Sequence, residues 1–115
     1  MVLGASPNKK RFAHTCVKSL LRYGYTVYPI GVKKGQIGEV DIIQDKPWVK
    51  DLHTVTIYLN PDNQQEYYNY LLKLQPMRVI FNPGAENQEL KEMLEYNNIE
   101  VVEACTLVML NAGNF

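Results

Sequence analysis

The chain alternates short stretches rich in β-branched and aromatic residues with amphipathic stretches of about a dozen residues, and this alternation limits the folds it can adopt. Strands are predicted at residues 1–4, 25–30, 54–59, 78–81 and 99–102. Strands separated by helical stretches of this kind pair in parallel through right-handed crossovers. We therefore predict an α/β protein with a three-layer Rossmann-like fold, in which a five-stranded parallel sheet is flanked by helices.

The helices are predicted from apolar spacing and from residues that start or stop a helix. Phe12 to Tyr23 places its apolar residues on one face, and Gly24 ends the helix. Asn60-Pro61 combines a capping residue with a proline suited to the first turn, so a second helix starts there. A third begins near Asn87, and residues 106–110 form a short final helix. The segment 31–53 is mixed, with a glycine-containing part at 31–38 and a turn at 46–48.

The length and the charge distribution indicate one domain, residues 1–115, with an anionic ligand at one end. The formal net charge is zero, yet all seven charged residues among the first 34 positions are basic. The rest of the chain contains five basic residues and all 12 acidic ones. An asymmetry of this kind points to an anion-binding region.

Several classes are disfavoured by composition. The sequence lacks a run of about 18 apolar residues and a secretory signal, so a cytoplasmic protein is expected. Cys16, Cys105, His14 and His53 have no metal-site spacing, and both thiols are expected to be reduced and buried. A pI near 6.7 disfavours nucleic-acid binding. The first strand is short, which is consistent with a natural start or a trimmed one.

The segment Gly4–Arg11 joins the first strand to the first helix and is a candidate phosphate site. Helix-start N–H groups, the hydroxyl of Ser6 and the side chains of Lys9, Lys10 and Arg11 would suit a phosphate. The segment has a single glycine, so it matches neither GxGxxG nor the GxxxxGK[ST] loop. The alternative is a tight turn whose basic residues are only solvated.

The segment after the second strand narrows the ligand class. An NAD-binding domain usually carries an acidic residue there for the adenosine ribose. This chain has Lys33 and Lys34 instead, which would attract a phosphorylated ribose, as in NADP or coenzyme A. Ordinary solvated lysines are the alternative.

Five segments together resemble the small stand-alone coenzyme A-binding proteins, which are similar to the nucleotide-binding domain of the succinyl-CoA synthetase α subunit. They are GASPNKKRFAH, GYTVYPIGVKKGQIGEV, the pair Asn60-Pro61, RVIFNPGAEN and VVEACTLVML. The resemblance implies a Rossmann-like domain that holds the ADP part of coenzyme A over the strand ends. The sequence departs from the family pattern at Gly31-Val32, where many relatives have Asn-Pro.

The same resemblance implies the cofactor-binding residues. It puts the pyrophosphate at Gly4, Ala5 and Ser6, with help from Lys9 or Arg11 and with Phe12 nearby. It puts the adenosine near Pro29, Lys33 and Lys34, and the pantetheine near Tyr58, Asn60, Asn82 and Gly84.

No catalytic constellation is found, which favours a non-catalytic protein that binds coenzyme A or acyl-CoA. His14 is expected to be exposed on the polar side of its helix, and His53 to be on the surface. Cys105 lies close to the strand ends, where burial or a mixed disulfide with a coenzyme thiol are the two interpretations. Glu86, Glu89, Glu92 and Glu95 form a solvated helix face. An NADP-dependent oxidoreductase component and a nucleotide-free interaction module, with a homodimer as its signature, remain as alternatives.

Overall fold

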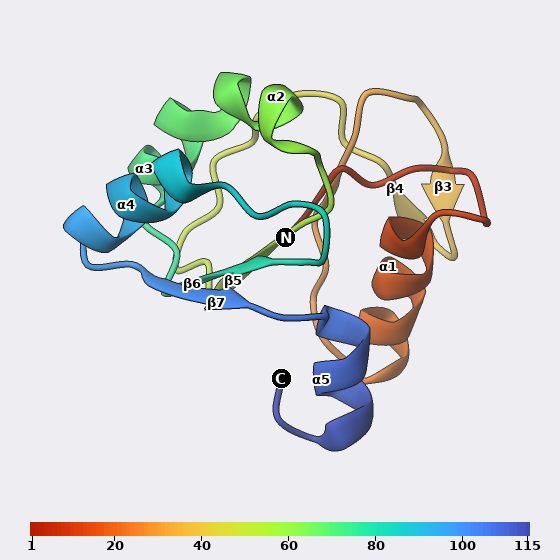
Figure 1. Ribbon diagram of the computed structural model, residues 1–115. Helices are drawn as coiled ribbons and strands as arrows, with labels where there is room; N and C mark the ends of the chain where they lie inside the picture. The colour runs from red at the N-terminus through yellow and green to blue at the C-terminus, as the bar shows by residue number, and fades with distance from the viewer.

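The computed structural model describes all 115 residues and contains one five-stranded parallel sheet (Figure 1). Its strands are β1 (Val2–Leu3), β2 (Pro29–Ile30), β5 (Thr54–Ile57), β6 (Arg78–Phe81) and β7 (Glu100–Glu103). They lie in the order β2-β1-β5-β6-β7, and all neighbouring pairs are parallel. The predicted α/β fold and its parallel sheet are confirmed.

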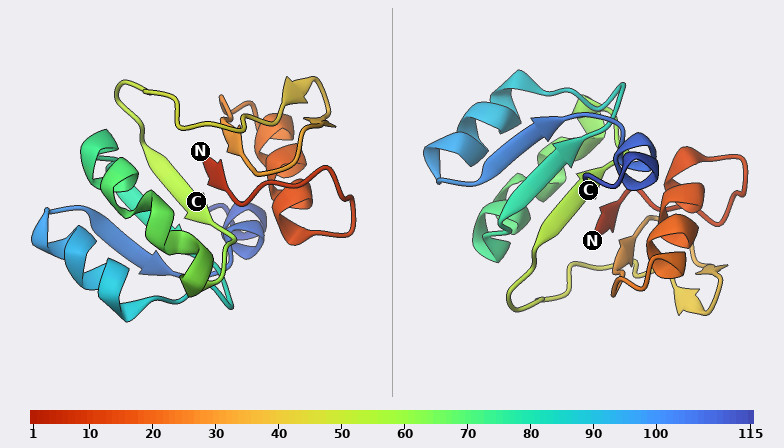
Figure 2. Two further views of the ribbon diagram at one scale, coloured as in Figure 1. Left: turned by 90° about the horizontal axis from the view of Figure 1, so that it is seen from above. Right: turned by 90° about the horizontal axis from the view of Figure 1, so that it is seen from below.

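Helices cover both faces of the sheet and complete three layers (Figure 2). One face carries α1 (Phe12–Arg22) and α5 (Thr106–Ala112), and the other carries α2 (Pro61–Gln64), a 3-10 turn (Gln65–Tyr67), α3 (Tyr68–Leu74) and α4 (Gln88–Tyr96). Each face has its own apolar core. The larger includes Leu3, Ile57, Phe81, Leu71 and Leu90, and the smaller includes Val2, Cys16, Val17, Ile37 and Leu110. None of the helices combines the length and apolarity that a membrane crossing requires.

Three strands are shorter than predicted: the first covers Val2–Leu3 instead of residues 1–4, and two others are limited by their neighbours. The prediction at 25–30 reduces to Pro29–Ile30, since its only partner in the sheet is β1, which has two residues. The prediction at 54–59 ends at Ile57, the last residue of β5 that pairs with β1 and β6. Tyr58 and Leu59 therefore belong to the loop that leaves the sheet.

The connection from β2 to β5 contains no helix, which agrees with the mixed segment predicted at residues 31–53. It contains an antiparallel hairpin, β3 (Gln36–Ile37) and β4 (Val40–Asp41), which the sequence analysis missed. Ile37 of the hairpin and Ile42, which follows it, are buried in the same core as α1. It lies beside α1 in Figure 1.

The predicted helix starts are confirmed by their caps. The side chain of Asn60 accepts a hydrogen bond from the Asn63 N–H at 3.1 Å, and that of Asn87 accepts one from the Leu90 N–H at 3.1 Å. One expected core residue is misplaced: Phe12 begins α1 but is 75% exposed.

Candidate functional site

The carboxyl end of β1 lies at the point where the chain changes direction across the sheet. From β1 the chain moves outward to β2, then returns past β1 to β5 and continues to β7. Ligands of open α/β sheets bind at such a switch point. The loops after β1 (residues 4–11) and after β5 (residues 58–60) therefore flank the expected site.

Gly4 shapes the first of these loops. Its φ is +96°, and a Cβ there would lie 3.1 Å from the Leu59 side chain and 3.2 Å from the carbonyl carbon of Tyr58. The N–H groups of Gly4 and Ala5 both donate to the Ile30 carbonyl, at 2.9 and 2.8 Å. These two N–H groups are thus used within the fold, and Ser6 is the first residue of the loop whose N–H is outside these bonds.

Glycines bring the loop after β2 (residues 31–35) against the loop after β1. A Cβ at Gly31 would lie 2.1 Å from the Ala5 carbonyl oxygen, and one at Gly35 would lie 2.7 Å from Cβ of Pro7. Side chains at these positions would therefore push the loops apart. We call residues 4–11 and 31–35 together the paired loops.

His14 is buried and contacts the loop after β1, contrary to the expectation that it is exposed. It is 4% exposed, and its Nδ1 lies 2.9 Å from the Ser6 carbonyl oxygen. A carbonyl only accepts, so Nδ1 carries the proton. Sequence reasoning missed this role because His14 borders the apolar stripe of α1, and only the folded loop shows which group its ring reaches.

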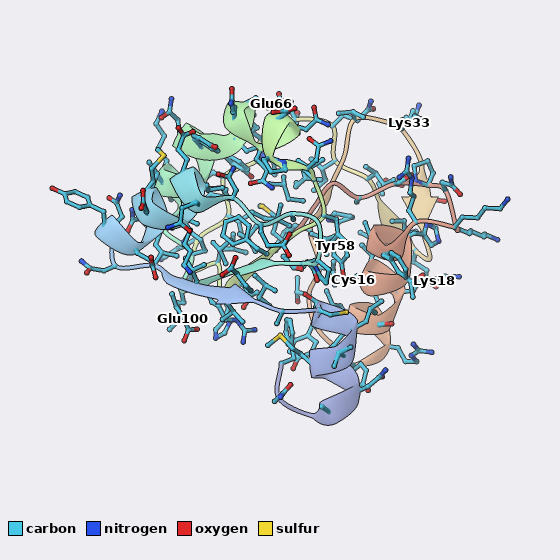
Figure 3. All side chains as sticks on the ribbon, viewed as in Figure 1. Cys16, Lys18, Lys33, Tyr58, Glu66 and Glu100 are labelled. Carbon is cyan, nitrogen blue, oxygen red and sulfur yellow. The ribbon has the colours of Figure 1, made fainter.

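The paired loops carry a group of unpaired positive charges. Lys9, Lys10, Arg11, Lys33 and Lys34 are all exposed. The one ion pair of the structure joins Lys91 and Glu103, so none of these five has a carboxylate partner. Helix α1 starts among them with no side-chain cap and no acidic residue in its first turn. Figure 3 shows Lys33 at the edge of the molecule on the same side as this helix start.

The residues predicted near the pantetheine divide into two kinds. Asn60 and Gly84 are exposed, although the Gly84 N–H donates to Oε1 of Glu86 at 2.8 Å. Asn82 is 2% exposed, and its amide donates to Thr56 Oγ1 and the Ile57 carbonyl and accepts from the Thr106 N–H. Asn82 thus joins β5, β6 and the start of α5.

Tyr58 points away from the loops into the core between α1 and α5. Its hydroxyl is buried without a hydrogen-bond partner, and burial raises the pKa of Tyr58, with Cys16 nearby as a further cause. Burial likewise raises the pKa of Cys16 to about 11. Cys16 is fully buried as predicted, whereas Cys105 is only half-buried, because it precedes α5 at the end of the sheet.

The remaining predicted positions have plain surroundings. Pro29 is buried in β2 beside the loop that carries Lys33 and Lys34. His53 and the four glutamates of the α4 region are exposed, as predicted.

Comparison with known proteins assigns the family. The profile of the CoA binding domain family matches residues 1–111. The chain belongs to the CoA-binding domain family. Membership supports coenzyme A binding in general by this chain. No curated protein matches it.

Solved structures of similar proteins share the fold of this chain. An uncharacterized protein is 49% identical with a TM-score of 0.96, covering 99% of this chain and 94% of that one. A hypothetical protein from Pyrococcus horikoshii is 24% identical with a TM-score of 0.82, covering 96% and 80%. A protein from Thermus thermophilus is 23% identical with a TM-score of 0.84, covering 99% and 87%. The last two likenesses concern the fold alone.

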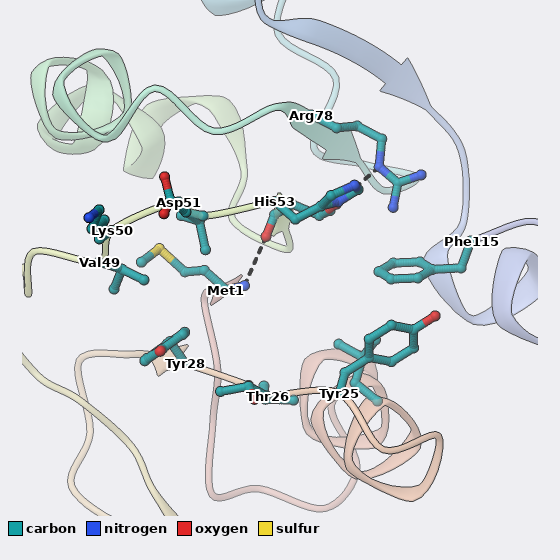
Figure 4. Close-up of a pocket in the computed structure, with 14 residues that line it drawn as sticks. Met1, Tyr25, Thr26, Tyr28, Val49, Lys50, Asp51, His53, Arg78 and Phe115 are labelled. Carbon is teal, nitrogen blue, oxygen red and sulfur yellow. Dashed lines mark hydrogen bonds between the residues drawn. The ribbon is translucent and has the colours of Figure 1, made fainter.

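A separate cavity of about 490 Å³ lies at the other end of the sheet from the paired loops, beside the amino ends of β1, β5 and β6 (Figure 4). Its wall includes Met1, Tyr25, His53, Arg78 and Phe115. The Arg78 guanidinium lies 4.7 Å from the centre of the Phe115 ring and donates from Nε to Thr54 Oγ1 at 3.1 Å. This cavity does not include any of the predicted cofactor-binding residues.

Proposed function

We propose that the protein binds coenzyme A or an acyl-CoA without catalysis and holds its ADP part on the paired loops. The strongest support is a set of five basic side chains without carboxylate partners. They lie on two loops that Gly31 and Gly35 allow to lie close together. Coenzyme A carries a pyrophosphate and a 3′-phosphate, so it needs positive charge at two neighbouring places. Phosphates prefer such clusters of basic side chains and helix N-termini.

The pyrophosphate is proposed to lie over Ser6 and the start of α1, within reach of Lys9 and Arg11. Gly4 and Ala5 set the shape of the loop and do not donate to the phosphates, because their N–H groups already bond to the Ile30 carbonyl. Phe12, exposed beside this helix start, offers an apolar surface to the ligand. Lys33 and Lys34 are proposed to meet the 3′-phosphate, with the adenosine beside Pro29.

The pantetheine is proposed to run past the carboxyl ends of β5 and β6. Asn60 and Gly84 are exposed there and border its path. Tyr58 and Asn82 support the floor of this path, since the Tyr58 hydroxyl and the Asn82 amide are both buried.

The polar groups of the paired loops are proposed to bind the ligand without reacting with it. The Ser6 hydroxyl accepts from the Asn8 N–H at 3.1 Å. The nearest imidazole, His14, contacts the Ser6 carbonyl rather than its hydroxyl. Ser6 thus lacks the adjacent base that a nucleophilic serine needs.

Isothermal titration calorimetry with coenzyme A, 3′-dephospho-coenzyme A and NADP tests the proposal. Coenzyme A should bind more tightly than the other two. Equal affinity for the dephospho form would contradict the role of Lys33 and Lys34, and no heat with either coenzyme A form would contradict the function.

A further inference from the structure

The cavity at the amino ends of β1, β5 and β6 has a wall of aromatic and aliphatic side chains. The rings of Tyr25 and Phe115 meet edge to face in this wall, with 5.2 Å between their centres. Leu20, Val49 and Leu52 add buried aliphatic groups. The volume of about 490 Å³ is within the range of small-molecule sites. The cavity is therefore suited to a small organic molecule with an apolar body.

Arg78 brings to this cavity a guanidinium that the fold uses on one edge only. Its Nε donates to Thr54 Oγ1 at 3.1 Å, and its central carbon lies 4.7 Å from the centre of the Phe115 ring (Figure 4). Nη2 is shielded from solvent and has no hydrogen-bond partner, which is uncommon for a buried polar group. The contacts with Thr54 and Phe115 hold the guanidinium in place and leave the edge with Nη1 and Nη2 free to bind a ligand.

No carboxylate of the protein pairs with Arg78. Glu100 is its register partner on β7, but the one ion pair of the structure joins Lys91 and Glu103. Asp51 is the one acidic residue of the cavity wall, which also contains Lys50, and it forms no ion pair with either cation. The wall therefore has an excess of positive charge, and the charge of Arg78 is available to an anion.

We propose that this cavity is a second ligand site, which binds a small carboxylate with an apolar body. The two oxygens of a carboxylate match the parallel N–H groups of Nη1 and Nη2. The apolar body of the ligand would lie against Tyr25 and Phe115. The site lies apart from the paired loops, and this inference does not depend on the proposed binding of coenzyme A.

The surroundings of Arg78 favour a carboxylate over a phosphate. Phosphate sites usually combine several cations with a helix start. The wall of this cavity contains no helix start, and the Met1 amino group within it already donates to the Thr54 carbonyl at 2.9 Å. A phosphate would also leave the apolar wall without a partner.

The test uses 3-phenylpropionate, which joins a carboxylate to an aromatic body. In an NMR titration of the isotope-labelled protein it should shift the amides of residues 25–28, 50–54 and 78, and these shifts should saturate together. The neutral isostere 3-phenylpropanamide should bind at least about tenfold more weakly, because it cannot form the charge-assisted pair. Inorganic phosphate should leave these amides unshifted.

Two variants separate recognition of the carboxylate from general attraction by charge. Arg78→Lys keeps the charge but removes the planar pair of donors, so its affinity for 3-phenylpropionate should fall at least about fivefold. Phe115→Leu leaves the Arg78 donor groups unchanged and should also weaken binding, because it removes the aromatic wall. Arg22→Lys makes the same exchange at an exposed arginine outside the cavity and should bind like wild type. Circular dichroism verifies that each variant is folded.

Equal affinity for the acid and the amide, unchanged affinity in folded Arg78→Lys, or no saturable shifts at the cavity would overturn the inference. Shifts centred on residues 6–12 and 31–35 would do so as well, because the carboxylate would then use the paired loops. A protein that binds coenzyme A but not 3-phenylpropionate keeps the proposed function and loses this inference. The reverse result contradicts the proposed function alone.

Discussion

Gly31 lies so close to Ala5 that a Cβ at position 31 would be 2.1 Å from the Ala5 carbonyl oxygen. The contact ties the loop after β2 to the loop after β1. Each loop alone is a short turn with basic residues, and together they form the surface on which we place the coenzyme phosphates.

Gly31→Ala should therefore damage both folding and binding. Relief of the clash requires a backbone shift, which costs roughly 1–3 kcal/mol of unfolding free energy. Urea unfolding measures the loss, and calorimetry should show weakened coenzyme A binding. Val32→Ala is the control, since Val32 is 75% exposed, and its stability should change by less than about 0.5 kcal/mol. Unchanged binding in a folded Gly31→Ala protein would argue against the paired loops as the site.

Lys33→Ala and Lys34→Ala should weaken coenzyme A binding while leaving dephospho-coenzyme A nearly unaffected. A charge-assisted contact with the 3′-phosphate is worth roughly 1–3 kcal/mol, so at least one variant should lose that much affinity. Lys73→Ala removes an exposed lysine of α3 and serves as the control. An equal loss for both ligands would assign these lysines to another part of the coenzyme.

His14→Phe should destabilise the protein and loosen the loop after β1. It removes the donor to the Ser6 carbonyl and leaves that acceptor without its partner, at roughly 1–3 kcal/mol. Thermal and urea unfolding measure the effect, with the exposed neighbour Thr15→Ala as control. Hydrogen exchange at residues 6–11 should accelerate in His14→Phe, and wild-type exchange there would contradict the role of this bond.

Asn82→Leu should be among the most destabilising substitutions. It removes donors to Thr56 and Ile57 and leaves the buried Thr106 N–H unsatisfied, so a loss of about 2 kcal/mol or more is expected. The exposed Asn69→Leu should have little effect in the same urea titration. A loss below about 0.5 kcal/mol for Asn82→Leu would show that this network contributes little.

The buried thiol of Cys16 predicts a loss of stability at alkaline pH. Its pKa is raised from the usual 9.0 to about 11, so the folded protein retains the proton that the unfolded chain releases. This contribution is complete below pH 9 and falls as the pH rises towards 11, by about 1 kcal/mol between roughly pH 8 and 10. Urea unfolding should show a steeper loss for wild type than for Cys16→Ala, and parallel curves would contradict it.

The sequence predicted the elements whose signals are local. The strand at Arg78–Phe81, the cap at Asn60 and the helix start near Asn87 are encoded within a few residues, and the structure confirms them. The hairpin after β2 was missed because its two-residue strands depend on packing of Ile37 against α1. Strand lengths near β1 were overestimated, since pairing partners rather than propensity decide where a strand ends.

The candidate site was predictable as a set of loops but not in its details. The position of the basic residues after β1 and β2 follows from the order of strands along the chain. The burial of His14 does not, because it depends on where the Ser6 carbonyl lies after folding. The use of the Gly4 and Ala5 N–H groups by Ile30 is equally non-local.

The most direct test of the account is an NMR titration of the isotope-labelled protein with coenzyme A. Amide shifts should concentrate at residues 6–12 and 31–35, with smaller changes at 58–60 and 84, and should saturate together. Shifts concentrated instead around Tyr25, His53, Arg78 and Phe115, or no shifts at all, would contradict the assignment of the coenzyme to the paired loops.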